Sequence, residues 1–301
     1  MDAPTLVADI GGTTARMALA RAGAVLADTI ATWPCAEHPD AEALLGAYLA
    51  GRPRPRAACL ALAGPVRDGA CDMTNRGWRV EAARLARGLG LEAVTLLNDL
   101  QAQAHALDHL TAQEMPRLRS GRERPGEARL VIGLGTGVNL AARLPCGTVP
   151  PAEAGQAALP AFDDETLALR HYLHREGTAG RIEDALSGAG LARLFAFHGG
   201  QPVAPRDVPE RLRAGDPAAR AAVDLYARIA GRVAQGWALA FLATGGVALA
   251  GSVARALAPE LGEGLRAAFA TAPLLADTPV HLVAADTAAL AGCAALMAGR
   301  A

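Results

Sequence analysis

Two glycine-rich turns, one in each half of the chain, have residue types that could bind phosphate. The first is Asp9–Thr13, with the sequence DIGGT, and the second is Gly133–Gly137, with the sequence GLGTG. Because glycine has no side chain, backbone N–H groups in such turns can approach phosphate oxygens closely. Neither turn opens a helix with the pattern G-x-G-x-x-G, which argues against a dinucleotide site. One glycine turn is often purely structural, so the pair, each with a threonine hydroxyl, is what indicates nucleotide binding.

A candidate acid–base group follows the apolar run Val94–Leu97, where Asn98 and Asp99 precede a helix predicted over residues 100–110. An aspartate in that place can cap the helix through its carboxylate. It can also act as a general base that takes the proton of a hydroxyl attacking a phosphoryl group. The residues alone leave both interpretations open.

The chain contains no lysine, so all 29 of its basic residues are arginine. A Walker A loop and a protein kinase each need a lysine on the phosphates, while pyridoxal enzymes and Schiff-base aldolases need an amine. The absence of lysine excludes all of these mechanisms.

Composition limits the class of protein further. The 301 residues are 51% hydrophobic with a net charge of -1, so the chain can bury a sizeable core and does not attract polyanions such as nucleic acid. Five scattered cysteines contain no C-x-x-C pair, which fits neither a disulfide scaffold nor a zinc site and favours a reducing compartment. The N-terminal residues lack the basic segment of a signal peptide. We therefore expect a cytoplasmic protein.

One uncharged stretch, residues 233–254, is long enough to suggest a membrane span. Thr244–Gly246 interrupts it near the middle. We predict instead the end of a buried helix, a turn, and a buried strand at Val247–Ala250, with no membrane partner.

The pattern of apolar runs and glycines repeats in the two halves of the chain. Leu6–Ile10 and Ala15–Ala20 predict a strand hairpin, and Leu130–Gly133 with Asn139–Leu144 predict a second one of the same kind. Two α/β lobes with a cleft between them are the implied architecture. The other predicted elements are strands at Ala27–Thr32, Ala57–Ala63, Val94–Leu97 and Val280–Ala284, helices at Asp40–Leu49 and Thr287–Met297, a mostly helical segment at 166–242, and a polar loop at 116–128.

Short motifs spread in order over nearly the whole chain resemble those of the bacterial glucokinase family. They are Asp9–Arg16, Ala63–Pro65, Met73–Trp78, Leu97–Asp99, Gly133–Gly137, Leu186–Leu191 and Gly245–Gly251. The His/Cys zinc cluster of the related ROK sugar kinases is missing, so a ROK protein is not expected.

The resemblance implies an actin/hexokinase-like, ribonuclease-H-like α/β fold with two lobes and a central cleft. The small lobe would comprise residues 1–109 and 286–301, and the large lobe residues 110–285. ATP with Mg²⁺ and a hexose would be the ligands, and the protein would be a homodimer.

The resemblance also implies roles for single residues. Asp99 would be the catalytic base for the sugar 6-hydroxyl, and Asp9 would hold Mg²⁺ through water. The residues expected to bind the sugar are Asn75, Asn98, Glu153, Gln156 and Glu183. The residues expected to bind ATP are Ala8, Asp9, Ile10, Gly11, Gly12, Thr13, Gly135, Thr136, Gly137 and Gly251.

The chain departs from the family pattern mainly around the expected sugar site. Gln156 replaces a histidine that hydrogen-bonds the sugar in the family. A glutamine amide can still donate, but if the geometry is not recovered the lost hydrogen bond costs roughly 1–3 kcal/mol. The other departures are Ala152, Ala154, Asn139 and Ser252 in place of glycine, and Thr14 in place of asparagine.

The favoured hypothesis is ATP-dependent phosphorylation of the 6-hydroxyl of glucose, the first step of glycolysis. One alternative is a kinase for another hexose, such as mannose or an amino sugar, because ångström-scale placement of the sugar ligands decides that choice. Another is a protein that binds a sugar or nucleotide with little turnover. The joint presence of Asp9, Asn98, Asp99, Glu153 and Glu183 favours the kinase.

Overall fold

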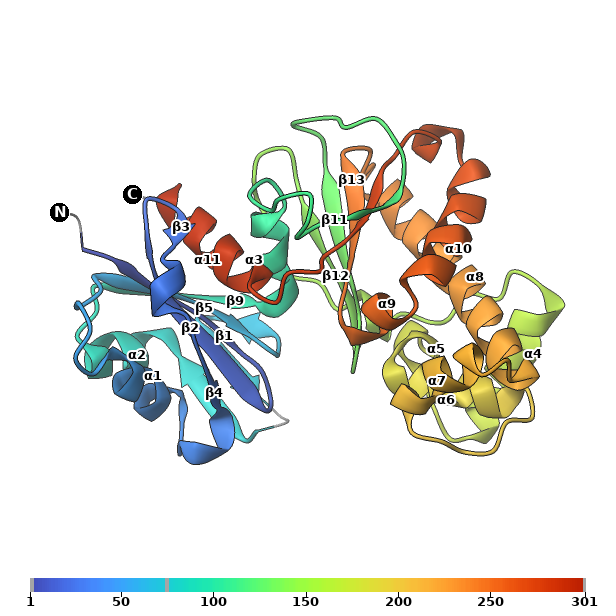
Figure 1. Cartoon of the computed structure of the whole chain (residues 1–301), viewed down its shortest axis with the longest axis horizontal. Helices are drawn as coiled ribbons and strands as arrows, with labels where there is room; N and C mark the ends of the chain where they lie inside the picture. The colour runs from blue at the N-terminus through green and yellow to red at the C-terminus, as the bar shows by residue number, and fades with distance from the viewer. Residues whose placement is uncertain (1–2, 74–75, 300–301) are drawn as a thin grey trace. The chain divides into compact units, whose positions relative to one another are not determined.

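The computed structural model describes residues 3–73 and 76–299 and divides into two compact units (Figure 1). The first unit combines the N-terminal part of the chain, through Thr111, with the C-terminal segment that starts at Ala285. The second unit is Ala112–Ala284. The end of the chain therefore completes the unit that its beginning starts.

The first unit is built on a six-stranded sheet in the order β3-β2-β1-β5-β9, with β4 paired to β2. β1 (Thr5–Ile10) is antiparallel to β2 (Thr14–Arg21) and parallel to β5 (Ala57–Leu62), which is parallel to β9 (Ala93–Asn98). Because these parallel strands share one direction, the turn after β1 and the residues after β9 lie at the same edge of the sheet.

Helices cover both faces of this sheet, which explains why β1 is an almost continuous apolar run. Leu6 and Ile10 belong to the core that α1 (Ala41–Leu49) and α2 (Ala82–Leu89) cover. Val7 belongs to the core that α3 and α11 cover. Side chains alternate along a strand, so Asp9 is on the same face as Val7.

The two helices on that second face, α3 (Asp99–Ala106) and α11 (Ala288–Ala298), approach each other closely. A Cβ added at Gly292 would lie 1.7 Å from the carbonyl oxygen of Ala102. Only glycine permits this approach, and the C-terminal helix is thereby packed against the helix that Asp99 begins.

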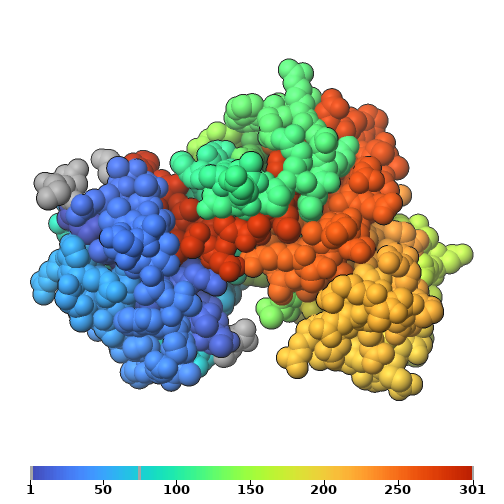
Figure 2. All heavy atoms as spheres, viewed as in Figure 1, coloured from blue at the N-terminus to red at the C-terminus, as the bar shows by residue number. Residues whose placement is uncertain are grey.

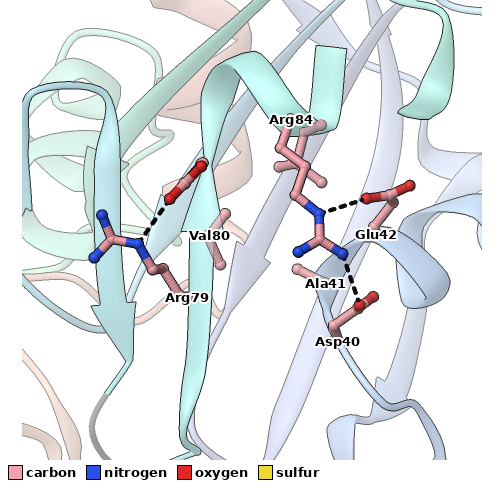
Figure 3. A pocket seen from close by; sticks show the side chains of 8 residues that line it. Asp40, Ala41, Glu42, Arg79, Val80 and Arg84 are labelled. Atoms are coloured by element: carbon pink, nitrogen blue, oxygen red, sulfur yellow. Dashed lines mark hydrogen bonds and ion pairs between the residues drawn. The ribbon is translucent and has the colours of Figure 1, made fainter. Parts of the chain in front are cut away.

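Ion pairs join α1 to α2 on the opposite face (Figure 3). Nη2 of Arg84 on α2 lies 3.6 Å from Oδ2 of Asp40, the N-cap of α1. Nε of the same arginine lies 3.2 Å from Oε2 of Glu42, in the first turn of α1. The remaining strands of this unit are β3 (Ala24–Val25), β4 (Ala31–Pro34), β6 (Val66–Arg67), β7 (Ala70–Met73) and β8 (Trp78–Glu81), the last three forming a separate antiparallel sheet.

The second unit repeats the arrangement of the first in a five-stranded sheet of order β10-β14-β13-β11-β12. β11 (Arg129–Leu134) is antiparallel to β12 (Val138–Arg143) and parallel to β13 (Gly246–Ala250), which is parallel to β14 (Val280–Leu282). A hairpin followed by two parallel strands is thus common to both units.

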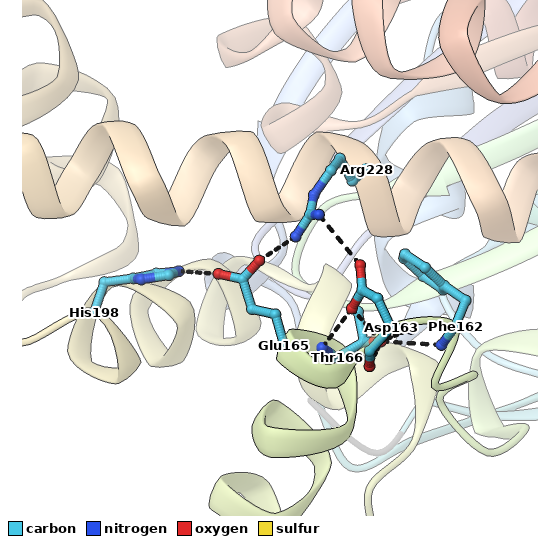
Figure 4. Close-up of polar contacts among 6 residues, drawn as sticks. All are labelled: Phe162, Asp163, Glu165, Thr166, His198 and Arg228. Atoms are coloured by element: carbon cyan, nitrogen blue, oxygen red, sulfur yellow. Dashed lines mark hydrogen bonds and ion pairs between the residues drawn. The ribbon is translucent and has the colours of Figure 1, made fainter.

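Helices fill the long segment between β12 and β13 and cover the sheet of the second unit. In Figure 2 the amber spheres, which the colour bar assigns to the part of the chain that leads into the long helix α8, form one continuous patch. Arg228 of α8 pairs with Asp163 at 3.2 Å and also with Glu165, which fastens the start of α4 to α8 (Figure 4). The helices before β13 are α4 (Asp164–Arg175), α5 (Ile182–Leu186), α6 (Gly188–Phe197), α7 (Val208–Arg213) and α8 (Pro217–Ala240), and those after it are α9 (Ser252–Ala256) and α10 (Ala258–Ala270).

Both predicted hairpins are confirmed, as is the interpretation of residues 233–254 as a helix end, a turn and a strand. Among the described residues, no helix combines the length and the apolar character needed to cross a bilayer. Two predictions were wrong in detail. Residues 116–128 contain the short strand β10 (Arg117–Arg119), and the strand expected at 27–32 is a 3-10 turn, Ala27–Thr29, between β3 and β4.

Candidate functional site

The first glycine turn connects β1 to β2. Gly11 N–H donates to the Thr14 carbonyl at 3.0 Å, a hydrogen bond within the turn. Cys35, which directly follows β4, donates its N–H to the Thr13 carbonyl at 2.8 Å. Both hydrogen bonds fix the conformation of the turn. The side chains of Ala8 and Ile10 are fully buried in the core. These two residues can therefore reach a nucleotide only through their backbone.

Asp9 is the charged side chain of this turn, and acidic neighbours surround it. Its strand partner is Arg16, whose Nη1 lies 3.9 Å from Asp9 Oδ2, while Nη2 of the same guanidinium lies 3.8 Å from Asp286 Oδ2. Burial, and after it the nearby carboxylate of Asp99, raise the pKa of Asp9 from 3.8 to about 6 against the opposing effect of Arg16. The site thus holds more negative than positive charge and favours a cation.

Asn98, rather than Asp99, is the N-cap of α3, so the capping interpretation of Asp99 was wrong. Asn98 Oδ1 accepts from Leu100 N–H at 2.9 Å, and Gln101 Oε1 accepts from Asn98 N–H at 3.0 Å. The Asn98 amide also donates to the Gly64 carbonyl at 3.3 Å. Asp99 is the first residue of the helix, and its Oδ1 accepts from Leu100 N–H at 2.8 Å.

Asn75, the remaining sugar-binding candidate of the first unit, lies outside the described residues. The next residue, Arg76, has its guanidinium carbon 5.0 Å from the centre of the Trp78 ring.

In the second unit, three motifs that are far apart in sequence meet at the second glycine turn. Gly135 N–H donates to the Gly137 carbonyl at 3.1 Å, and the Gly135 carbonyl accepts from Gly188 N–H at 2.7 Å. Gly251 packs on the backbone of the same turn, where an added Cβ would lie 2.4 Å from the Leu134 carbonyl oxygen. Thr136 lies between these glycines. The structure therefore brings together the expected ATP-binding residues of this unit.

The expected sugar ligands of this unit, Glu183 and Gln156, are hydrogen-bonded to each other. Glu183 Oε2 accepts from Val138 N–H at 2.9 Å, which joins it to β12, and Glu183 Oε1 accepts from Gln156 Nε2 at 3.3 Å. Gln156 Oε1 in turn accepts from Arg181 Nη1 at 2.6 Å.

Glu153 is held from both sides by the side chain of Asn139. The Asn139 amide donates to the Ala152 carbonyl at 2.5 Å, and its Oδ1 accepts from Ala154 N–H at 3.0 Å. A glycine at this position would leave both bonds unmade. The sequence marked Asn139 as a departure but gave no sign of this contact, and nothing in the sequence pointed to Arg181.

Gly251 provides a direct test of the packing around the second turn. Its φ of 99° already disfavours other residues, and Gly251→Ala would also force the new Cβ against Leu134. We expect the Michaelis constant for ATP to rise about 10-fold or more, with the constant for the sugar less affected, in steady-state assays.

Gly147→Ala is the matched control, since Gly147 has a φ of 82° but nothing within 4 Å of an added Cβ. It shares the backbone strain without the collision. If both substitutions raised the Michaelis constant for ATP equally, the packing of Gly251 on the turn would have no role in ATP binding.

Comparisons with known proteins agree over the full length. The sequence model of the family described as Glucokinase matches residues 6–300. The chain is 36% identical to a Glucokinase of Chromohalobacter salexigens, over 98% of both chains, and 32% identical to one of Cupriavidus metallidurans, over 100% of this chain and 95% of the relative.

Solved structures show the same similarity. A glucokinase from an Antarctic psychrotroph matches with a TM-score of 0.88 and 27% identity, over 99% of this chain and 100% of the other. A ROK family glucokinase from Streptomyces griseus, in complex with glucose and AMPPNP, shares the fold with a TM-score of 0.69 and 20% identity, over 99% and 100%.

Proposed function

The chain belongs to the glucokinase family. On that premise we propose which of its residues take each role in the phosphorylation of glucose by ATP. The chain has the actin/hexokinase-like α/β fold that the sequence predicts, and ATP-dependent phosphorylation of glucose is its activity. The match to the family over residues 6–300 is the single observation that carries this conclusion.

Asp99 is proposed as the base. It would accept the proton of the sugar 6-hydroxyl while the hydroxyl oxygen attacks the γ-phosphorus and the bond to the bridging oxygen of ADP breaks. Its place supports this role: Asn98 caps α3, so the Asp99 carboxylate is not required for capping.

The phosphates are proposed to bind to the two glycine turns through backbone N–H groups and the hydroxyls of Thr13 and Thr136. This arrangement suits a chain without lysine.

The residues around Asp9 fit Mg²⁺, which prefers carboxylate, phosphate and water oxygens. Asp99 and Asp286 both raise the pKa of Asp9, so an added cation would relieve their repulsion. The resemblance to the family implies that Asp9 would hold Mg²⁺ through water, and the carboxylates near Asp9 support that role. When bound, the metal ion supplies neutralisation of phosphate charge.

The residues proposed to bind the sugar are Asn75, Asn98, Glu153, Gln156 and Glu183. The carboxylates of Glu153 and Glu183 accept from sugar hydroxyls, and the Gln156 amide donates to one. Hydrogen bonds that already hold Glu183 to β12 support its part, because a fixed acceptor loses less freedom on binding.

A coupled assay of ADP release with a panel of hexoses tests the activity and the choice of sugar. We expect glucose to give the highest kcat/KM, with mannose and glucosamine lower. Absence of sugar-dependent ADP release would contradict the function, and a stronger response to another hexose would reassign the substrate.

Two further properties, which the resemblance supports, are proposed for the protein in the cell: it acts as a homodimer, and it lies in the cytoplasm at the first step of glycolysis. Light scattering at micromolar concentration measures the first, and a monomer at all concentrations would contradict it.

A further inference from the structure

Arg181 lies beside Gln156 because two segments of the second unit pair with each other. Ala158 and Arg181 form an antiparallel bridge, with Ile182 N–H donating to the Ala157 carbonyl at 2.9 Å. One more bond, from Leu159 N–H to Gly180, extends the pairing. The segment that holds Gln156 is thereby fastened to the segment that holds Arg181 and Glu183.

The neighbours of Gln156 determine which way its carboxamide faces. A guanidinium has only donors, so the oxygen of the carboxamide must face Arg181, at 2.6 Å from Nη1. A carboxylate has only acceptors, so the nitrogen must face Glu183, at 3.3 Å from Oε1. The reverse orientation would set donor against donor and acceptor against acceptor.

We propose that Arg181 is a positioning residue for glucose, acting through Gln156. By holding the carboxamide oxygen, Arg181 fixes the Nε2 amide beside Glu183, where its second hydrogen can be donated to a sugar hydroxyl. The inference rests on the proposed sugar-binding role of Gln156. It explains how a glutamine works in this chain at the position where the family pattern has a histidine.

If the Arg181 side chain served only to stabilise the fold, its replacement would lower the thermal unfolding midpoint. Its backbone N–H donates to Asp184 Oδ2 at 2.8 Å at the start of α5, and the bridge to Ala158 is also made by the backbone. Both contacts survive replacement of the side chain. We therefore expect Arg181 variants to keep the thermal unfolding midpoint of the native protein.

The test is a double-mutant cycle on the full chain. Arg181→Met keeps an unbranched apolar stem without the guanidinium donors, Arg181→Lys keeps a donor, and Gln156→Leu removes the carboxamide. Calorimetry without nucleotide gives Kd for glucose, and the coupled assay gives KM and kcat. Arg220→Met is the control, since Arg220 is an exposed arginine on α8 of the same unit whose Nη1 lies 3.8 Å from Oδ1 of Asp224, one turn along the same helix.

Arg181→Met should raise Kd and KM for glucose about 5- to 20-fold with kcat within about 2-fold, and Arg181→Lys should recover most of the loss. In the Gln156→Leu background, Arg181→Met should add less than about 2-fold. Arg220→Met should change nothing.

The outcomes separate this inference from the function itself. If the native protein does not phosphorylate glucose, the proposed function fails. If the native protein does so but Arg181→Met binds glucose normally, the positioning role is overturned. If Arg181→Met weakens binding equally with and without Gln156, Arg181 does not act through Gln156. If Arg181→Met does not fold, Arg181→Ala replaces it in the cycle with Gln156→Leu.

Discussion

Asp99→Asn is expected to lower kcat for glucose phosphorylation by about 10²- to 10⁴-fold while leaving KM for glucose and ATP within a few-fold. An amide cannot accept the proton of the attacking hydroxyl, but it is close to a carboxylate in size and can keep the contact that Asp99 Oδ1 makes with Leu100 N–H. Steady-state kinetics with the ADP-coupled assay measures the effect.

The fold should survive this substitution because Asn98 and Gln101 provide the capping box of α3. Thermal unfolding midpoints of the two proteins should therefore agree. A kcat within about 3-fold of the native value, in a protein with an unchanged midpoint, would show that another group takes the proton.

Asp9→Asn is expected to stabilise the metal-free protein at neutral pH and to reduce its activity by about 10²-fold or more. Burial and the neighbouring carboxylates raise the pKa of Asp9 from 3.8 to about 6, so the folded state holds this proton more tightly than the unfolded state does. The stability that the protonated carboxyl contributes is complete below pH 3.8 and is lost as the pH rises to about 6. The loss amounts to about 3 kcal/mol of unfolding free energy.

Urea unfolding between pH 4 and pH 8, without Mg²⁺ or ATP, measures this difference. The variant cannot titrate at position 9, so its advantage over the native protein should be small at pH 4 and reach about 3 kcal/mol above pH 7. Asp224→Asn on the exposed side of α8 is the control and should show no such growth. A constant difference across this range would contradict the raised pKa of Asp9.

The elements that the sequence predicts well are the ones in which pattern and packing agree. β1 and β11 are apolar runs closed by glycine, and both are central strands buried by helices on their sheets. β10 could not be predicted, because it is only three residues long, two of them arginine, and pairs with β14 at one edge of the sheet. This segment is a strand because it forms backbone hydrogen bonds with β14, a contact that its own residues do not encode.

The site could be predicted in its residue types but not in its connections. Asp9 and Asp99 follow apolar runs and could be identified from the printed sequence. The carboxylate crowding that raises the pKa of Asp9 depends also on Asp286, which is 277 positions further along the chain in the sequence. The contact of Arg181 with Gln156 likewise depends on the pairing of two loop segments. No periodic pattern in the sequence predicts that pairing.

The packing of α11 against α3 also limits the order in which the two units can fold during synthesis. α11 packs against α3, β1 and β5, yet it is the last helix to be synthesised. At about 5–20 residues per second, residues 112–284 are synthesised before α11, so much of the second unit can fold while the first is still incomplete. The buried face that β1 and α3 leave for α11 would remain exposed during that interval. A released fragment that comprises residues 1–284 should therefore be cleaved by protease in its first unit and protected in its second.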